Sequence, residues 1–349
     1  MQYRKLGRTD QELSLIGLGT MTWGEQNTEA DAHAQIDMAL DYGVNVVDAA
    51  EMYPVPPKPE TQGRTETMIG NWIAKSGRRS SLFLTSKAAG PVRDPKRPTH
   101  IRNGQTSLNR KDLTQALDQS LQRLQTDYLD LYQLHWPDRT TETFGRKRYP
   151  WPDPEETVSI LETLEALDGF VKAGKVRFIG LSNETPWGLG QFLKYAETEG
   201  LTRIASIQNA FSLLCRGYEN GLSEFSHLEQ VSLLAYSPLA MGVLTGKYRH
   251  GARPAGARLT VYERFDRYTS PQAMEIAEAY CALAEANGMT PATMALAWVN
   301  SRPFVASNLI GATTLAQLKE NLESVEVKLS EDVLEEIDRL HELQPNPGR

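Results

Sequence analysis

Residues 44–50 read VNVVDAA, an apolar run of strand length that contains one acid, Asp48, near its end. Seven other apolar runs of similar length occur along the chain, and stretches in which apolar residues recur every three or four positions lie between them. This alternation is typical of β/α units built around a parallel sheet. The predicted strands are residues 13–19, 44–50, 82–88, 129–136, 176–183, 204–210, 231–239 and 304–312.

The number of strands separates two α/β architectures. Eight strands, each followed by a helical stretch, predict a (β/α)₈ TIM barrel. A doubly wound sheet usually has fewer strands and a G-x-G-x-x-G turn after its first strand. The stretch GLGT at 17–20 keeps only the start of that turn, because Met21 and Thr22 follow it. We therefore expect one α/β barrel domain over residues 1–349, with an N-terminal β-hairpin and long loops at the carboxyl-terminal face.

Three long segments follow predicted strands, at residues 88–109, 137–153 and 240–270. Loops in these positions belong to the carboxyl-terminal rim of a barrel, where barrel enzymes build their active sites. The sequence therefore predicts a functional site at that rim.

Composition excludes several classes of protein. A net charge of −7 argues against nonspecific binding of nucleic acid, which requires a basic face, although a local pocket for one small phosphate ligand remains compatible with it. The two cysteines, Cys215 and Cys281, cannot form a disulfide framework, and no Cys/His spacing suggests a bound metal. No stretch approaches the ~18 apolar residues of a membrane span, and residues 1–10 lack the apolar core of a signal peptide. We expect a cytoplasmic protein without a membrane partner.

Polar side chains gather at the ends of three consecutive predicted strands. Asp48 ends the second strand and is followed by Tyr53, Lys87 ends the third, and His135 ends the fourth. Each has a structural explanation by itself: a cap, a packed phenol, a solvated charge and a core imidazole. Together they form a proton-transfer set, in which Asp48 keeps Lys87 charged and Lys87 lowers the pKa of the Tyr53 hydroxyl. His135 would orient the oxygen that receives the proton.

Such a set suits protonation of a carbonyl oxygen while a hydride reaches the carbon. No side chain donates a hydride, so a nicotinamide cofactor is implied. The later strands carry suitable groups for it: amide and hydroxyl groups at Ser182, Asn183 and Gln208, the ring of Tyr236, and the cation of Lys247. The alternative for Ser182 or Asn183 is capping of the helix that begins near residue 186.

The whole chain resembles the aldo-keto reductases, most closely their bacterial Tas-like branch. The resemblance is carried by the spaced set Asp48, Tyr53, Lys87 and His135 and by the stretches GLGTMT (17–22), DAAEMYPVPP (48–57), LQTDYLDLYQLHWP (124–137), LTGKY (244–248) and FVASNLIGATT (304–314). It implies a barrel that binds NADP(H) and reduces aldehydes or ketones, with Tyr53 as the general acid.

The resemblance also implies a set of cofactor contacts. Ser182, Asn183 and Gln208 would hold the carboxamide, and Tyr236 would stack on the nicotinamide ring. The other implied contact positions are Thr20, Gln26, Asp48, Ser237, Pro238, Leu239, Gly242, Leu244, Gly246, Lys247, Arg258, Gly311, Thr313, Gln317, Glu320 and Asn321.

One departure from the family pattern affects the nucleotide phosphate. Many members carry Lys-Ser and an Arg around the 2′-phosphate, whereas this chain has Gly311, Ala312 and Gln317 there. Arg258 and Lys247 are left as the phosphate partners, and strict preference for NADP over NAD is not implied.

Two other classes of function predict different residues. Channel-associated family members bind NADPH, turn over slowly and lack a histidine at the position of His135, so its presence favours an active reductase over a regulatory or redox-sensing subunit. A phosphate-metabolising barrel without nicotinamide would show a Gly-rich phosphate loop after the last strands and no Tyr/Lys/His set. For the carbonyl substrate, the predicted pocket walls are Trp23, Trp136, Tyr149 and Trp151, with Trp187 as a further aromatic candidate. The oligomeric state stays open.

Overall fold

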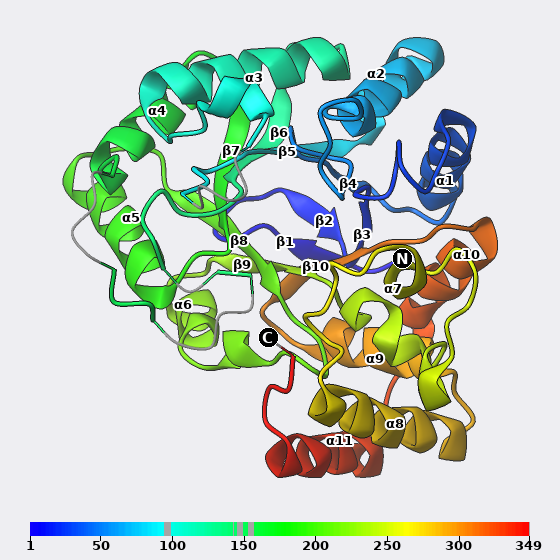
Figure 1. The fold of residues 1–349 in the computed structure, drawn as a ribbon. Helices are drawn as coiled ribbons and strands as arrows, with labels where there is room; N and C mark the ends of the chain where they lie inside the picture. Colours follow the sequence, from blue (N-terminus) through cyan, green and yellow to red (C-terminus); the bar gives the residue numbers. More distant parts are fainter. Residues whose placement is uncertain (94–98, 142, 145–148, 153–156, 349) are drawn as a thin grey trace.

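In the computed structural model, eight parallel strands close into a barrel surrounded by helices (Figure 1). The structure describes residues 1–93, 99–141, 143–144, 149–152 and 157–348. Each barrel strand lies within a run predicted as a strand, so the (β/α)₈ prediction is confirmed. In order around the barrel, the strands are β10 (Val305–Ile310), β3 (Ile16–Gly19), β4 (Val46–Asp48), β5 (Phe83–Ala88), β6 (Leu129–Leu134), β7 (Val176–Ser182), β8 (Ile204–Ala210) and β9 (Ser232–Tyr236).

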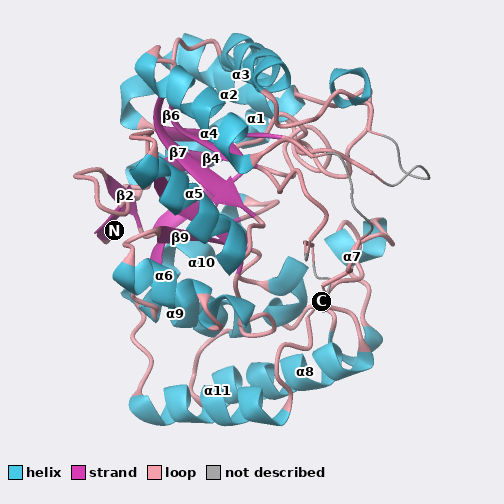
Figure 2. Ribbon diagram, turned by 90° about the vertical axis from the view of Figure 1, so that its left-hand side faces the viewer, coloured by secondary structure: helices cyan, strands magenta, loops and turns pink. Residues whose placement is uncertain are grey.

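Helices cover the outside of the barrel because one face of each is apolar and packs on the strands. Those between strands or directly after the last one are α1 (Glu29–Asp41), α2 (Arg64–Ser76), α3 (Arg110–Leu124), α4 (Ile160–Lys172), α5 (Pro186–Thr198), α6 (Leu222–Leu228), α9 (Pro291–Ser301) and α10 (Leu315–Glu323). Two further helices, α8 (Pro271–Ala286) before β10 and α11 (Glu331–Leu343) near the carboxyl terminus, lie side by side along one flank (Figure 2).

The two ends of the barrel differ. An antiparallel hairpin of β1 (Tyr3–Lys5) and β2 (Glu12–Ser14) lies at the amino-terminal end, as expected (Figure 2). Its side chains Leu6 and Leu13 are fully buried against residues that line the barrel interior. The three long loops leave the opposite end, where the short helix α7 (Arg258–Val261) lies within the loop after β9.

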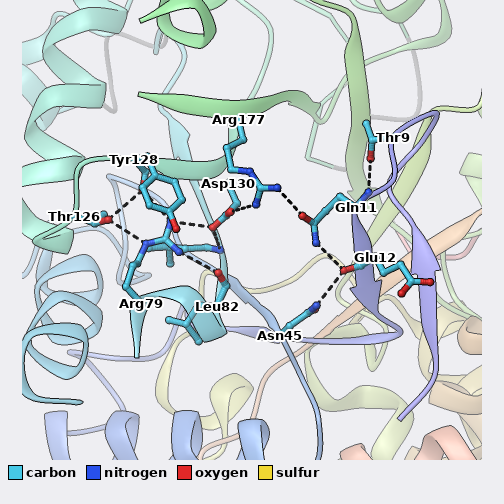
Figure 3. A network of polar contacts seen from close by, with 11 residues as sticks. Thr9, Gln11, Glu12, Asn45, Arg79, Leu82, Thr126, Tyr128, Asp130 and Arg177 are labelled. Atoms are coloured by element: carbon cyan, nitrogen blue, oxygen red, sulfur yellow. Dashed lines mark hydrogen bonds and ion pairs between the residues drawn. The ribbon is translucent and has the colours of Figure 1, made fainter. Parts of the chain in front are cut away.

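A buried carboxylate ties the hairpin to the barrel floor (Figure 3). Asp130 in β6 pairs with Arg79 at 2.9 Å and with Arg177 at 2.6 Å, and it accepts the backbone N–H of Leu84 at 2.9 Å. Arg177 also donates to the side-chain oxygen of Gln11, which lies next to β2, at 2.9 Å. Because both oxygens of Asp130 are satisfied, a charge that would be costly to bury joins the three strands β5, β6 and β7 and the hairpin.

We expect Asp130→Asn to lower the free energy of unfolding by about 3 kcal/mol, because it leaves two guanidinium groups without their shared anion. The matched control is Asp118→Asn. Its carboxylate pairs with Lys175 at 2.6 Å but is half exposed, so a loss below about 1 kcal/mol is expected. Urea unfolding followed by circular dichroism measures both values, and equal losses would contradict this account.

Candidate active site

The strand ends bring the four predicted catalytic residues together. The Lys87 ammonium in β5 lies 2.6 Å from a carboxylate oxygen of Asp48 in β4 and 5.0 Å from the centre of the Tyr53 ring. The rings of Tyr53 and His135 meet edge to face, with their centres 5.7 Å apart. All four side chains are buried or nearly so. An acid, a cation, a phenol and an imidazole therefore share one site at the carboxyl ends of β4, β5 and β6.

Asp48 is the centre of a larger hydrogen-bond network. Its Oδ1 accepts from the Thr85 hydroxyl at 2.5 Å and from the amides of Gln208 at 2.9 Å and Gln133 at 3.3 Å, while Oδ2 accepts from Lys87. Sequence reasoning missed Thr85 and Gln133. Their signal was the two-residue period of a strand, which places Thr85 on the same face as Lys87.

The ammonium of Lys87 is completely buried. Burial lowers its pKa, and the charge and hydrogen bond of Asp48 oppose that shift. Lys87 also donates to the carbonyl oxygen of Ala49 at 2.8 Å. The carboxylate of Asp48 therefore favours the protonated form of Lys87, which is the role that the sequence predicted for it.

The Tyr53 hydroxyl differs from its prediction. We expected Lys87 to lower the pKa of this hydroxyl, but the pKa is raised well above its usual value of about 10. The largest cause is burial, followed by the negative charge of Asp48, while Arg258 acts in the opposite direction. The phenol therefore holds its proton at neutral pH.

The His135 imidazole is neutral at physiological pH. Burial, and next the positive charge of Lys87, lower its pKa well below the usual 6.5. Its backbone N–H donates to Ala88 at 2.8 Å, and its carbonyl accepts from the Asn183 amide at 2.9 Å, which fixes the chain on both sides of the ring. Nδ1 is buried and has no partner among the described residues. A neutral imidazole carries one N–H that can donate to a carbonyl oxygen.

The residues predicted to bind the carboxamide and the nicotinamide ring form a continuous chain of hydrogen bonds across β7, β8 and β9. Ser182 donates to the backbone oxygen of Gln208 at 2.7 Å, the Asn183 amide donates to Ser182 at 3.2 Å, and the Tyr236 hydroxyl donates to Asn183 at 2.6 Å. Because Gln208 also bonds Asp48, this chain reaches the acid at the centre of the network.

The alternative role of Ser182 and Asn183 as helix caps is wrong. Thr185 caps α5, since its hydroxyl accepts the backbone N–H of Gly188 at 3.3 Å. Asn183 instead adopts a left-handed backbone conformation, with φ of 52°, and Ser237 after β9 does the same with φ of 56°. Such conformations are costly for residues other than glycine and gather at functional sites.

Two cations stand near each other in the loop after β9. Burial lowers the pKa of both Lys247 and Arg258, and the charge of Arg258 lowers the pKa of Lys247 further. Neither makes an ion pair with a carboxylate within the described part of the chain. An anionic group such as a nucleotide phosphate would relieve this repulsion, so the pair fits one. The predicted backbone positions Ser237, Pro238, Leu239, Gly242, Leu244 and Gly246 belong to the same loop.

The residues predicted to contact the adenosine end of the nucleotide lie at the start of α10. The side-chain oxygen of Gln317 accepts the backbone N–H and the hydroxyl of Thr313 at 3.0 and 3.1 Å. Asn321 reaches toward the carbonyl of Gly311 at 3.5 Å, and a side chain at Gly311 would meet open space. The negative charge of Glu320 acts on Lys247, so this end adjoins the two cations.

The loop after β3 contacts both parts of the predicted cofactor site. Thr20 donates to the carbonyl of Asp48 at 2.7 Å. Gln26 donates to the carbonyl of Gly256 at 3.0 Å, and its neighbour Asn27 donates to the carbonyl of Thr313 at 3.0 Å. These bonds join the loops after β3, β9 and β10 across the carboxyl-terminal face.

The aromatic pocket prediction needs one correction. Trp23 is fully buried and donates to the Gln35 side chain in α1 at 3.1 Å, so it packs in the core and does not line an open pocket. Trp136 lies beside His135, with ring centres 5.1 Å apart. Tyr149 and Trp151 contact each other at the surface, and Trp151 is 85% exposed.

The other aromatic candidate, Trp187, lines a cavity of about 240 Å³ near the site. The cavity lies beside the ends of β6 and β7 and the helices α4 and α5, and Ser182 contributes to its wall. Within the described ranges, no group of His, Cys, Asp and Glu residues is placed to hold a metal, and no helix is long and apolar enough to cross a bilayer.

Comparison with known proteins finds relatives over the full length of the chain. The family model described as Aldo/keto reductase family matches residues 15–342. Protein tas of Escherichia coli is 54% identical over 348 residues, which cover 100% of both chains. The uncharacterized oxidoreductase YrpG of Bacillus subtilis is 32% identical, over 100% of this chain and 97% of that protein. A probable voltage-gated potassium channel subunit beta of Arabidopsis thaliana is 29% identical, over 99% of this chain and 98% of that protein.

The depressed pKa of His135 predicts a loss of stability in acid. Below pH 6.5 the unfolded chain binds a proton at this histidine and the folded chain does not, so acidification favours unfolding. Between pH 7 and 5.5 the contribution is about 1 kcal/mol. His135→Gln should therefore lose about that much less stability over this interval than the parent, as measured by urea unfolding at each pH. His227→Gln, at an exposed position, is the control, and an unchanged pH dependence in His135→Gln would contradict the assignment.

Proposed function

The chain belongs to the aldo/keto reductase family, and from this premise we propose that it is an NADPH-dependent oxidoreductase that reduces the carbonyl group of an aldehyde or a ketone to an alcohol. The observation that carries the proposal is the buried constellation of Asp48, Lys87, Tyr53 and His135. A purely structural set of polar residues would not require a phenol and an imidazole to face each other next to a buried ion pair.

Each residue of the constellation has a role in the proposed reaction. A bound reduced nicotinamide would supply the hydride that the carbonyl carbon accepts. The neutral imidazole of His135 donates a hydrogen bond to the carbonyl oxygen and orients it toward Tyr53. Tyr53 transfers its proton to the oxygen as negative charge develops there. The positive charge of Arg258 stabilises the phenolate that remains, with the Lys87 ammonium 5.0 Å from the ring. Asp48 acts through Lys87, which it keeps protonated.

Residues at the carboxyl-terminal ends of β7, β8 and β9 and in the loops that follow β7 to β10 would supply the proposed cofactor site. Ser182, Asn183 and Gln208 hold the carboxamide, and Tyr236 packs on the nicotinamide ring. Support comes from the hydrogen bonds that already join these side chains to one another. Gln317 and its neighbours at the start of α10 would receive the adenosine end.

The position of Arg258 favours the diphosphate over the 2′-phosphate as its partner. Its charge acts on Tyr53 and on Lys247, so the guanidinium is near both the reacting end and the second cation. In an extended nucleotide the diphosphate is the phosphate group closer to the nicotinamide. We therefore propose the diphosphate as the partner of Arg258, in place of the 2′-phosphate that the sequence alone had suggested for Arg258 and Lys247.

A regulatory subunit with little turnover is the second candidate function. It is favoured by the full-length similarity to a protein described as a probable potassium channel subunit beta. A neutral, buried histidine beside the phenol favours the reductase instead. Turnover of a panel of aldehydes, ketones and quinones with NADPH separates the two, since a regulatory subunit would bind the nucleotide but reduce every compound of the panel only slowly.

We further propose that the protein works in the cytoplasm on a small-molecule carbonyl compound, without a nucleic-acid or membrane partner. The two cysteines, Cys215 and Cys281, are free thiols, which supports a reducing compartment.

Tyr53→Phe should reduce kcat for carbonyl reduction ~100-fold or more, because it removes the transferable proton and little else. Binding of NADPH, followed by fluorescence titration, should change less than about twofold in Kd. Tyr3→Phe removes a hydroxyl that donates to Gly43 at the opposite end of the barrel and should leave kcat unchanged. Near-normal turnover by Tyr53→Phe would refute the proposed general acid.

Arg258→Ala should weaken NADPH and NADH by similar factors, about tenfold each, because the diphosphate is common to both. The control is Arg249→Ala in the same loop, whose guanidinium already pairs with Glu278 and Glu285. Titration of each variant with both nucleotides gives the four dissociation constants. A loss of affinity confined to NADPH would show that Arg258 binds the 2′-phosphate and not the diphosphate.

A further inference from the structure

A second buried ion pair lies behind the catalytic set. The Arg102 guanidinium and the Glu51 carboxylate are 3.0 Å apart, with side chains 2% and 0% exposed. Glu51 stands between Asp48 and Tyr53 in the loop after β4, whereas Arg102 belongs to the long loop after β5. A fully desolvated pair costs free energy to bury and is weak evidence for a stabilising role.

The pair joins three elements of the carboxyl-terminal face. Glu51 accepts the backbone N–H of Ala89 at 2.6 Å, and its own N–H donates to the carbonyl of Lys87 at 3.2 Å. Arg102 donates to the carbonyl of Ala89 at 3.2 Å and to that of Asp112, in the first turn of α3, at 2.7 Å. Both backbone polar groups of Ala89 are therefore held by this one pair.

Every catalytic residue is close to the pair along the chain or through one backbone bond. Tyr53 follows Glu51 by two residues, and its N–H donates to the carbonyl of Ala50 at 3.0 Å. Ala89 follows Lys87 by two residues, and the residue between them, Ala88, accepts the backbone N–H of His135 at 2.8 Å. A shift of Ala89 would therefore reach both the cation and the imidazole.

The backbone around Arg102 is strained. Arg102 and the next residue, Asn103, both adopt left-handed conformations, with φ of 47° and 55°. Two such residues in succession persist only where the surroundings hold them. In addition, Glu51 Oε2 and Arg102 Nε are buried without partners among the described residues. A pair built for stability alone would satisfy these atoms and avoid the strain.

We propose that Glu51 and Arg102 are positioning residues, which set the distance between the Tyr53 phenol and the His135 ring by holding the loops after β4 and β5 against each other. This inference rests on the proposed reductase function. Neither residue touches the reacting atoms in this scheme. Both act through the backbone of residues 50 to 53 and 87 to 89.

The test compares Glu51→Gln with Asp130→Asn. Both replace a buried, ion-paired carboxylate by its isosteric amide, but Asp130 lies at the opposite end of the barrel. For Glu51→Gln we expect kcat for carbonyl reduction to fall at least tenfold, while the Kd for NADPH changes less than twofold. Asp130→Asn should leave kcat within about twofold at a temperature where it is folded, although it lowers the unfolding midpoint. Equal kcat for Glu51→Gln and the parent would overturn the proposal.

Hydrogen exchange of the holoenzyme provides a readout that does not need turnover. Glu51→Gln should speed exchange in peptides that cover residues 48–53 and 87–93, and Asp130→Asn should speed it near residues 82–84 and 129–131. If the parent reduces no carbonyl, the proposed function fails, while exchange still shows whether the pair holds both loops. Unchanged exchange in residues 87–93 would overturn the positioning role in either case.

Arg102→Lys serves as the second variant in case Glu51→Gln does not fold. It keeps the positive charge beside Glu51 but loses the fork that binds two carbonyls at once. Under the proposal, the kcat of Arg102→Lys is lower than that of the parent, and its affinity for NADPH is unchanged. A kcat equal to that of the parent would show that charge compensation is the whole role of the pair, and would overturn the positioning role.

Discussion

The carboxyl-terminal end of the barrel depends on the hydrogen bonds that surround the buried carboxylate of Asp48. A charge in this position is costly unless it is paired and fully hydrogen-bonded, and donors from β5, β6 and β8 meet that requirement. These donors reach it only in one strand register, in which Asp48 pairs with Thr85 and Lys87 pairs with Gln133. The site and the barrel register therefore support each other, since a slipped strand would leave a buried anion without donors.

The two ends of the barrel treat their buried polar groups differently. At the amino-terminal end the carboxylate of Asp130 binds two guanidinium groups and a backbone amide, and the hairpin covers it. At the other end, Asn183, Ser237 and Arg102 adopt left-handed conformations, and His135 keeps a buried nitrogen without a described partner. The amino-terminal end of the strands thus carries a stabilising network, and the carboxyl-terminal end carries the candidate site, as is usual for this architecture.

Sequence patterns predicted the strands and the four central residues because both depend on local order: apolar runs, and polar residues at their ends. What they did not predict depends on the third dimension. Trp23 was assigned to a pocket because its burial against α1 has no signature in the chain. The pKa of Tyr53 is raised because its hydroxyl is buried, and this effect outweighs the positive charge of Arg258. Glu51 and Arg102 meet only through the folding of a long, irregular loop, and Thr85 needed its strand face to be recognised.

The order of the site along the chain determines what a single substitution can affect. The proposed proton-transfer groups lie between residues 48 and 135, whereas most of the proposed nucleotide contacts lie between residues 182 and 321. The side-chain bond from Gln208 to Asp48 joins the two segments directly. A substitution in the second segment can alter the proposed nucleotide site and leave Asp48, Tyr53, Lys87 and His135 in place, except at Gln208, where it would also remove a donor to the buried carboxylate.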